Sequence, residues 1–226
     1  MHPLQRLPSP SPSVSLLVHS LGFLSFSSSF HFLFSWDTPI ATSYGWYLQF
    51  FTIIGLAVSH LCFTLALLAD LSSSRALFRL KNVLAVAAAP LESVITLLYW
   101  GFSAVDPDLI VPAEYDLPFV QDLGFHAAPA VFLLLDMLLL SPPWTISTTG
   151  AAGLAFGLMA AYWVWVELCF SHNGSYPYPL FEILSTWQRA ALFACSAVIA
   201  TASIMASKWL YARVNGSGVP GKAKKL

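Results

Sequence analysis

Titratable side chains lie inside long apolar stretches of this chain, where a charge is costly. Placing such a side chain in lipid costs about 3 kcal/mol on insertion scales, so these residues are candidates for function. Two of the polar residues in these stretches suggest a specific chemistry. A threonine hydroxyl becomes a nucleophile when a neighbouring base takes its proton, and Thr52 and His126 can form such a pair. The other titratable residues within the apolar stretches are His19, His60, Glu92, Asp136 and Glu167.

Thr52 and His126 are expected at nearly the same depth in the membrane, on two helices that start from the same side. Thr52 lies six residues after Trp46, which is about 9 Å along a helix, and His126 lies seven residues after Phe119, which is about 10 Å. Asp122 precedes His126 by four residues, so it shares a helix face with the imidazole and can orient the ring. The spacing therefore predicts a nucleophile, a base and a supporting carboxylate.

Each of these residues also has a structural interpretation. Threonines in membrane helices commonly donate to a carbonyl of their own helix, and a histidine there more often bonds to a neighbouring helix. Glu92 and Glu167 are expected to be hydrogen-bonded within the bundle. Ser59 and Asp70 share the helix face of Thr52, so we expect that face to point into the bundle rather than toward lipid.

The composition indicates an integral membrane protein. Charged residues make up 9% of the 226 residues and apolar ones 57%, whereas a soluble domain carries about 25% charged residues. Residues 7–36, 38–69 and 190–207 contain no Asp, Glu, Lys or Arg, and each run can cross a hydrocarbon core of about 30 Å as a helix. The runs are continuously apolar, which favours helices over a barrel. An all-α bundle embedded in the lipid bilayer is predicted, and the net charge of −1 argues against a nucleic-acid partner.

The chain divides into a tail, a membrane domain and a second tail. Residues 1–13 are rich in proline and serine and are predicted to be disordered, residues 14–211 form the membrane domain, and residues 212–226 form a basic cytosolic tail. The first apolar run can be a signal peptide, but its length and the missing cleavage site favour a retained helix. Gly153 and Gly157 predict close packing of the fifth helix. Six spans are expected, at residues 14–35, 46–69, 83–104, 119–140, 147–170 and 187–211.

The basic residues set the expected orientation. Six spans place nine of the ten on one side, with only Arg189 opposite, so both termini are predicted to be cytosolic. The last five residues, 222–226, carry lysines three and five places from the end, like a retrieval signal of the endoplasmic reticulum. A basic tail bound to anionic lipid explains the same lysines. The nine are Arg6, Arg75, Arg79, Lys81, Lys208, Arg213, Lys222, Lys224 and Lys225.

Other classes of protein remain as alternatives. The three cysteines all lie in apolar runs and indicate neither a disulfide framework nor a metal site, and no metal or cofactor is expected. A haem or metal binder would use His31, His126 and His172, although the paired spacing of haem bundles is missing. A transporter or a non-catalytic scaffold is favoured by the prolines in the third and fourth spans.

Three segments resemble a known family. These are GWYLQFFTIIG…LLADLSS (residues 45–73), DLGFHAAPAVFLLLD (122–136) and YPLFEILSTWQR (178–189), and together they resemble the androgen-induced and androgen-dependent membrane protein family. The resemblance implies six spans and an integral-membrane threonine hydrolase of fatty acid esters of hydroxy fatty acids. Thr52 and His126 stand at the family's catalytic positions, whereas Asp122 stands where the family often has asparagine. Ala127, Ala128 and Pro129 replace a more polar stretch.

The predicted orientation can be tested with glycosylation tags. Tags inserted in the loop at residues 106–118 should be modified, because this loop then lies on the non-cytosolic side. Tags at either end of the chain should stay unmodified. Modification at Leu226 together with an unmodified loop would reverse the topology.

Overall fold

The computed structural model describes residues 13–111, 115 and 117–215, and this part of the chain contains helices and no strands. The predicted tail at residues 1–13 therefore lies outside the described residues, apart from Ser13, and so does most of the second tail. The elements are α1 Val14–Ser35, η1 Pro39–Thr42, η2 Trp46–Gln49, α2 Phe51–Ser72, α3 Arg75–Ser103, η3 Pro107–Leu109, α4 Phe119–His126, α5 Ala128–Leu140, α6 Thr148–Asn173, α7 Pro179–Ile183 and α8 Thr186–Asn215.

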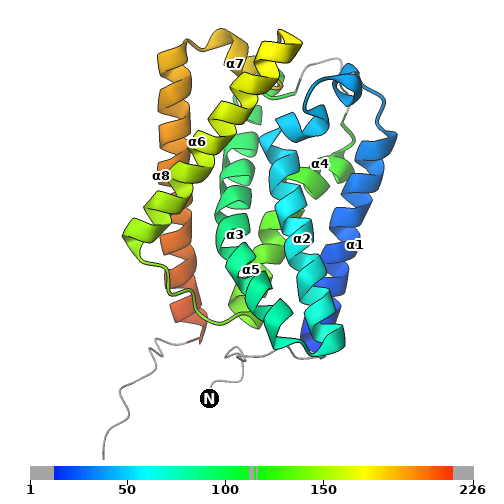
Figure 1. Cartoon of the computed structure of the whole chain (residues 1–226), viewed down its shortest axis with the longest axis vertical. Coiled ribbons are helices and arrows are strands. Elements are labelled where there is room, and N and C mark those ends of the chain that lie inside the picture. The colour runs from blue at the N-terminus through cyan, green and yellow to red at the C-terminus, as the bar shows by residue number, and fades with distance from the viewer. Residues whose placement is uncertain (1–12, 112–114, 116, 216–226) are drawn as a thin grey trace, which may run out of the picture.

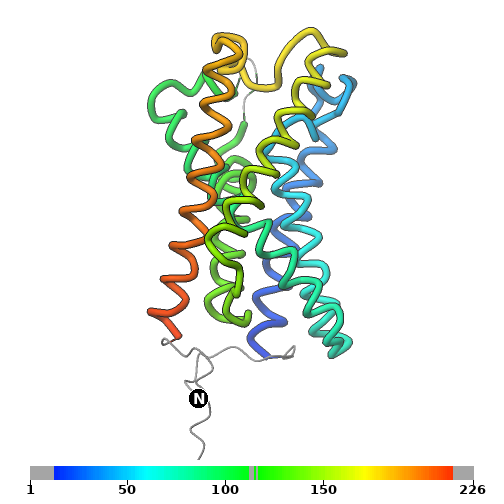
Figure 2. The backbone as a smooth tube through the Cα atoms, turned by 60° about the vertical axis from the view of Figure 1, so that its left-hand side comes forward, coloured from blue at the N-terminus to red at the C-terminus, as the bar shows by residue number. Residues whose placement is uncertain are grey.

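The long helices run side by side between two ends of the molecule (Figure 1). Five of the described helices are long and apolar enough to cross a membrane, namely α1, α2, α3, α6 and α8, and there are six such spans if the bent pair α4–α5 is one span. The start of α1 and the end of α8 lie at the same end of the bundle, as an even number of crossings requires (Figure 2). The opposite end carries η1, η2 and α7, and α4 lies deeper in the bundle (Figure 1). The predicted all-α polytopic bundle is confirmed.

The fourth span is not the continuous helix expected at residues 119–140. It breaks at Ala127, whose backbone angles are φ −136° and ψ −45°, and α4 and α5 meet at an angle of 43°. Pro129 explains the break, since proline has no N–H to donate and its ring crowds the carbonyl one turn earlier. The His126 carbonyl next to the break accepts a hydrogen bond of 2.8 Å from Thr96 Oγ1. His126 therefore ends a short helix instead of lying within a long one.

The second span also differs from the expectation. Residues Trp46–Gln49 form a 3-10 turn, Phe50 is extended, and α2 starts only at Phe51. Gly45 precedes the turn with φ +85°, a left-handed conformation that glycine adopts without strain. Thr52 is consequently the second residue of α2. The predicted depth of Thr52 assumed a continuous helix from Trp46, and that assumption was wrong.

The helix boundaries at the other end of the bundle extend beyond the predicted spans. α3 starts at Arg75, eight residues before the expected position, because the Ser74 side chain accepts a hydrogen bond of 3.4 Å from the Leu77 N–H and caps the helix. Lys81 is therefore part of a helix and not of a loop.

The prediction that Gly153 and Gly157 allow close packing of the fifth span was wrong, since a side chain added at either position would meet nothing within 4 Å.

α1 is an integral member of the bundle. A Cβ placed on Gly22 would lie 2.4 Å from the Phe63 ring, so the missing side chain lets α1 approach α2 closely. Thr52, Ser59 and Asp70 of α2 are buried, which confirms that this face of α2 points into the bundle.

A buried network of ionisable side chains ties four helices together near the end opposite α4. Lys81 Nζ of α3 donates to both carboxylate oxygens of Asp136 in α5, at 2.7 and 2.8 Å, and to Ser141 Oγ at 2.8 Å. His19 of α1 lies 2.9 Å from Asp136 through Nε2 and 2.7 Å from Asp70 of α2 through Nδ1. Lys81 is fully buried, and the negative charge of Asp136 compensates its positive charge there.

We predict that Lys81→Met destabilises the protein strongly, by about 3–5 kcal/mol, because Asp136 then remains charged, buried and without its main partner. The double change Lys81→Met with Asp136→Leu should be less destabilising than the single change. Arg79→Met, at an exposed position two residues away, is the control and should have little effect. Thermal unfolding of the detergent-solubilised variants measures this. Equal stability of Lys81→Met and Arg79→Met would contradict the assigned role of the ion pair.

Candidate functional site

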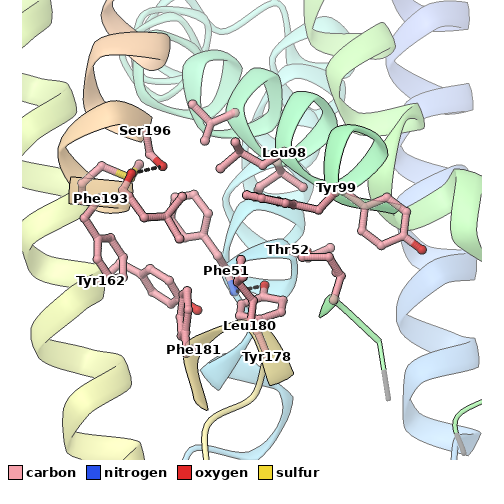
Figure 3. Close-up of a pocket in the computed structure, with 16 residues that line it drawn as sticks. Phe51, Thr52, Leu98, Tyr99, Tyr162, Tyr178, Leu180, Phe181, Phe193 and Ser196 are labelled. Carbon is pink, nitrogen blue, oxygen red and sulfur yellow. Dashed lines mark hydrogen bonds between the residues drawn. The ribbon is translucent and has the colours of Figure 1, made fainter. Parts of the chain in front are cut away.

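Two apolar cavities lie toward the end of the bundle that carries η1, η2 and α7. The α3–α8 cavity is lined mainly by α2, α3, α6, α7 and α8, with Leu98, Met159 and Ser196 among its residues (Figure 3). The α1–α4 cavity is lined mainly by α1, η1, η2, α2, α4 and the loop before α4. Three residues line both cavities, and they are Thr52, Ile110 and Tyr178. Thr52 therefore stands where the two cavities meet.

Thr52 lies in the first turn of α2, where backbone N–H groups have no partner within the helix. The Phe51 N–H donates instead to the Tyr178 hydroxyl, at 2.9 Å. The Thr52 side chain also interacts with this hydroxyl. Thr64, the other threonine of α2, donates to the His60 carbonyl at 2.8 Å, which is the structural role commonly found for threonine in membrane helices. The described part of the chain shows no such bond from Thr52 to its own helix.

Tyr178 reaches the start of α2 from the loop between α6 and α7. Its ring packs edge-on against Phe50, with ring centroids 5.3 Å apart, and Pro179 directly after it begins α7. Burial raises the pKa of the Tyr178 phenol above its usual value, so the hydroxyl keeps its proton and can donate it. Figure 3 shows Tyr178 beside Phe51 and Thr52 at the edge of the α3–α8 cavity.

Two hydrogen bonds from α6 fix the segment before α2. The Tyr162 hydroxyl donates to the Gln49 carbonyl at 3.0 Å, and Trp165 Nε1 donates to the Leu48 carbonyl at 2.9 Å. These carbonyls lie at the end of η2, where the 3-10 turn gives way to the extended residue Phe50. The position of Thr52 is therefore set by α6 as well as by its own helix.

His126 is held on two sides. Its Nδ1 atom lies 2.7 Å from Asp122 Oδ1 and 3.2 Å from the Asp122 carbonyl oxygen, one turn earlier in α4. The imidazole stacks on the Tyr99 ring, with centroids 3.4 Å apart and planes 3° from parallel. An Nδ1 proton donated to Asp122 leaves the Nε2 lone pair available to accept a proton. Both hydrogen bonds that the described residues make with this ring use Nδ1.

The structure brings Thr52 and His126 to the same cavity. Both line the α1–α4 cavity, and both are buried, with exposed fractions of 7% and 6%. No hydrogen bond joins the two side chains among the described residues. Asp122 contacts the imidazole as the four-residue spacing predicted. The catalytic roles of the three residues stay predictions.

The sequence of this chain is similar to those of known membrane proteins. Residues 14–212 match the family described as FAR-17a/AIG1-like protein. The chain belongs to this family. A membrane protein of the UPF0641 group from Schizosaccharomyces pombe is 31% identical over 189 residues, which cover 83% of this chain and 85% of the relative. The androgen-induced gene 1 protein of Homo sapiens is 25% identical over 182 residues, covering 72% and 75%. No solved structure matches the chain.

Two other ionisable residues, Glu92 and Glu167, are hydrogen-bonded to neighbouring side chains. Glu92 accepts a hydrogen bond of 2.8 Å from Ser59, and Glu167 accepts from Trp163 at 3.0 Å and Tyr176 at 2.9 Å, so both glutamates are bonded within the bundle as expected. Among the described residues, no group of three or more His, Cys, Asp or Glu side chains is arranged to hold a metal ion.

Two contacts of the site could not be predicted from the sequence. Tyr99 lies on a different helix from His126, and no spacing within one helix could reveal their stacking. Tyr178 was part of a motif shared with the family, but its bond to the start of α2 spans 127 residues. The Tyr178–Pro179 pair was the available signal, because proline is common at the first position of a helix and so predicts that Tyr178 directly precedes one.

Proposed function

We propose that this protein is a membrane-embedded hydrolase of lipid esters, in which Thr52 is the nucleophile and His126 the general base. The observation that carries the proposal is the position of Thr52 at the junction of two apolar cavities, one of which also contains His126. The resemblance to the family's threonine hydrolases indicates fatty acid esters of hydroxy fatty acids as the substrate class. Such a substrate has two long apolar arms and reaches the site from the bilayer.

The reaction begins with removal of a proton from the Thr52 hydroxyl. His126 accepts the proton at Nε2 while Thr52 Oγ attacks the carbonyl carbon of the ester. Asp122 holds the ring through Nδ1 at 2.7 Å and stabilises the positive charge that the imidazole gains. Release of the alcohol leaves an ester of Thr52, which water then hydrolyses with His126 again as the base.

The start of α2 can stabilise the negative oxygen of the tetrahedral intermediate. The positive end of the helix favours a negative charge there. The Tyr178 hydroxyl is anchored by the Phe51 N–H and keeps its proton, so it can donate to this oxygen. We assign Tyr178 as a donor to the oxyanion.

The proposed location follows from the charge distribution. The basic residues favour cytosolic termini, and the lysines at residues 222–226 favour the endoplasmic reticulum or another endomembrane. The cavities then lie toward the non-cytosolic face, within the apolar part of the bundle. A role in lipid metabolism is the physiological setting that this arrangement supports.

We predict that Thr52→Ala, His126→Ala and the double variant each reduce ester hydrolysis to about 1% or less, by similar factors, because residues that act as one unit are not additive. Thr52→Ser should retain more activity than Thr52→Ala, since it keeps the hydroxyl. Asp122→Asn should cost less than either alanine change, because an amide can also bond to Nδ1. Hydrolysis of fatty acid esters of hydroxy fatty acids by purified variants measures these effects.

Thr64→Ala is the matched control, because Thr64 lies on the same helix and is bonded to its own backbone. It should keep full hydrolysis and full labelling by a fluorophosphonate probe, which Thr52→Ala should lose. A scaffold or transporter has no activated hydroxyl and would not be labelled in the unaltered protein. Undiminished hydrolysis by folded Thr52→Ala would end the proposal.

We predict that Tyr178→Phe lowers kcat by about a hundredfold with a smaller effect on KM, as the loss of one oxyanion donor does. Tyr176→Phe is the matched control. Its hydroxyl donates to Glu167 at 2.9 Å and the residue lines neither cavity, so its kcat should be close to that of the unaltered protein. Equal kcat values for the two variants would remove Tyr178 from the mechanism.

A further inference from the structure

We propose that the two cavities separate the two arms of the ester, with the alcohol arm in the α1–α4 cavity and the acyl arm in the α3–α8 cavity. This inference rests on the proposed function, because it concerns the orientation of a substrate that Thr52 attacks. Thr52, Ile110 and Tyr178 line both cavities, so the ester carbonyl lies beside these three residues.

The position of His126 decides the orientation. When Thr52 Oγ bonds to the carbonyl carbon, its proton passes to His126 Nε2. The bond between that carbon and the alcohol oxygen then breaks, and the same proton passes from Nε2 to the alcohol oxygen, which leaves as a neutral alcohol. The alcohol oxygen must therefore lie next to His126. Since His126 lines the α1–α4 cavity and not the α3–α8 cavity, the alcohol arm extends into the former.

The second half of the reaction requires the same arrangement. Departure of the alcohol leaves space beside His126 in the α1–α4 cavity, and water enters there. His126 takes a proton from this water while the oxygen attacks the acyl carbon. The bond to Thr52 Oγ then breaks, Oγ regains the proton from His126, and the carboxylic acid is released. Throughout these steps the acyl arm stays on the side of Thr52 away from His126.

The α3–α8 cavity suits the acyl arm. Apolar side chains from several helices line it, including Leu98 of α3, Met159 of α6 and Phe193 of α8. Such a lining is apolar and can enclose a hydrocarbon chain. In Figure 3, Thr52 and Tyr178 lie on one side of this cavity and Phe193 and Ser196 on the other, so a chain that starts at Thr52 runs toward α8.

The two cavities can be narrowed separately. Ser196 lines only the α3–α8 cavity, and its hydroxyl bonds to the Leu192 carbonyl of its own helix at 2.8 Å, so Ser196→Leu adds volume without removing a contact between helices. Val111 lines only the α1–α4 cavity and is half-buried, so Val111→Phe adds volume there. Neither residue belongs to the proposed catalytic groups. Ser196→Val and Val111→Leu are milder versions for use if a larger variant does not fold.

The test uses two series of esters, one with a fixed alcohol and acyl chains of increasing length, and one with a fixed acyl chain and alcohols of increasing length. Ser196→Leu should lower kcat/KM for the longest acyl chains by about tenfold or more and leave the profile over the alcohols unchanged. Val111→Phe should lower kcat/KM for the longest alcohols by a similar factor and leave the profile over the acyl chains unchanged.

The opposite pairing of variant and series would overturn the orientation. So would equal changes in both series, or unchanged profiles from folded variants, because the two arms would then not be separated by these cavities. In each of these cases the unaltered protein still hydrolyses esters, and only the orientation fails. An unaltered protein that hydrolyses no ester in either series would contradict the proposed function itself.

Discussion

Backbone polar groups in the hydrocarbon region of a membrane must find their partners within the protein, because no water is available there. This constraint acts most strongly where helices begin and end. α2 begins inside the bundle, and the free N–H of Phe51 is satisfied by the Tyr178 hydroxyl from a distant loop. The break between α4 and α5 leaves the His126 carbonyl to be bonded by Thr96. The residues of the candidate site are thus placed by the same bonds that make irregular backbone tolerable in the bundle.

Buried charges need partners within the protein as well. Lys81 is compatible with complete burial because Asp136 and Ser141 surround its ammonium group, and His19 links Asp136 to Asp70. This network lies near one end of the bundle, and the two cavities lie toward the other. The helices α1, α2, α3 and α5 are fixed by ionic contacts at one end, whereas the cavities are formed by aromatic and aliphatic side chains.

The sequence predicts the class of fold well because continuous apolar runs have a single stable solution in lipid. It also predicts which face of α2 points inward, from the spacing of Thr52, Ser59 and Asp70. It fails where a helix is interrupted. Hydropathy does not distinguish the 3-10 turn before Phe51 from helix, and it does not reveal the bend at Ala127, although Pro129 was a visible cause. Contacts between distant segments, such as Tyr99 with His126, depend on how the helices pack and cannot be read from one chain.

The ion pair between α3 and α5 bears on how the protein is made. Lys81 precedes Asp136 by 55 residues, so the ribosome places the lysine in the membrane before its carboxylate exists. During that interval the lysine lacks the carboxylate that it contacts in the folded protein. The network that joins α1, α2 and α3 to α5 is therefore incomplete until α5 has been made. The final packing of these four helices therefore follows the synthesis of α5.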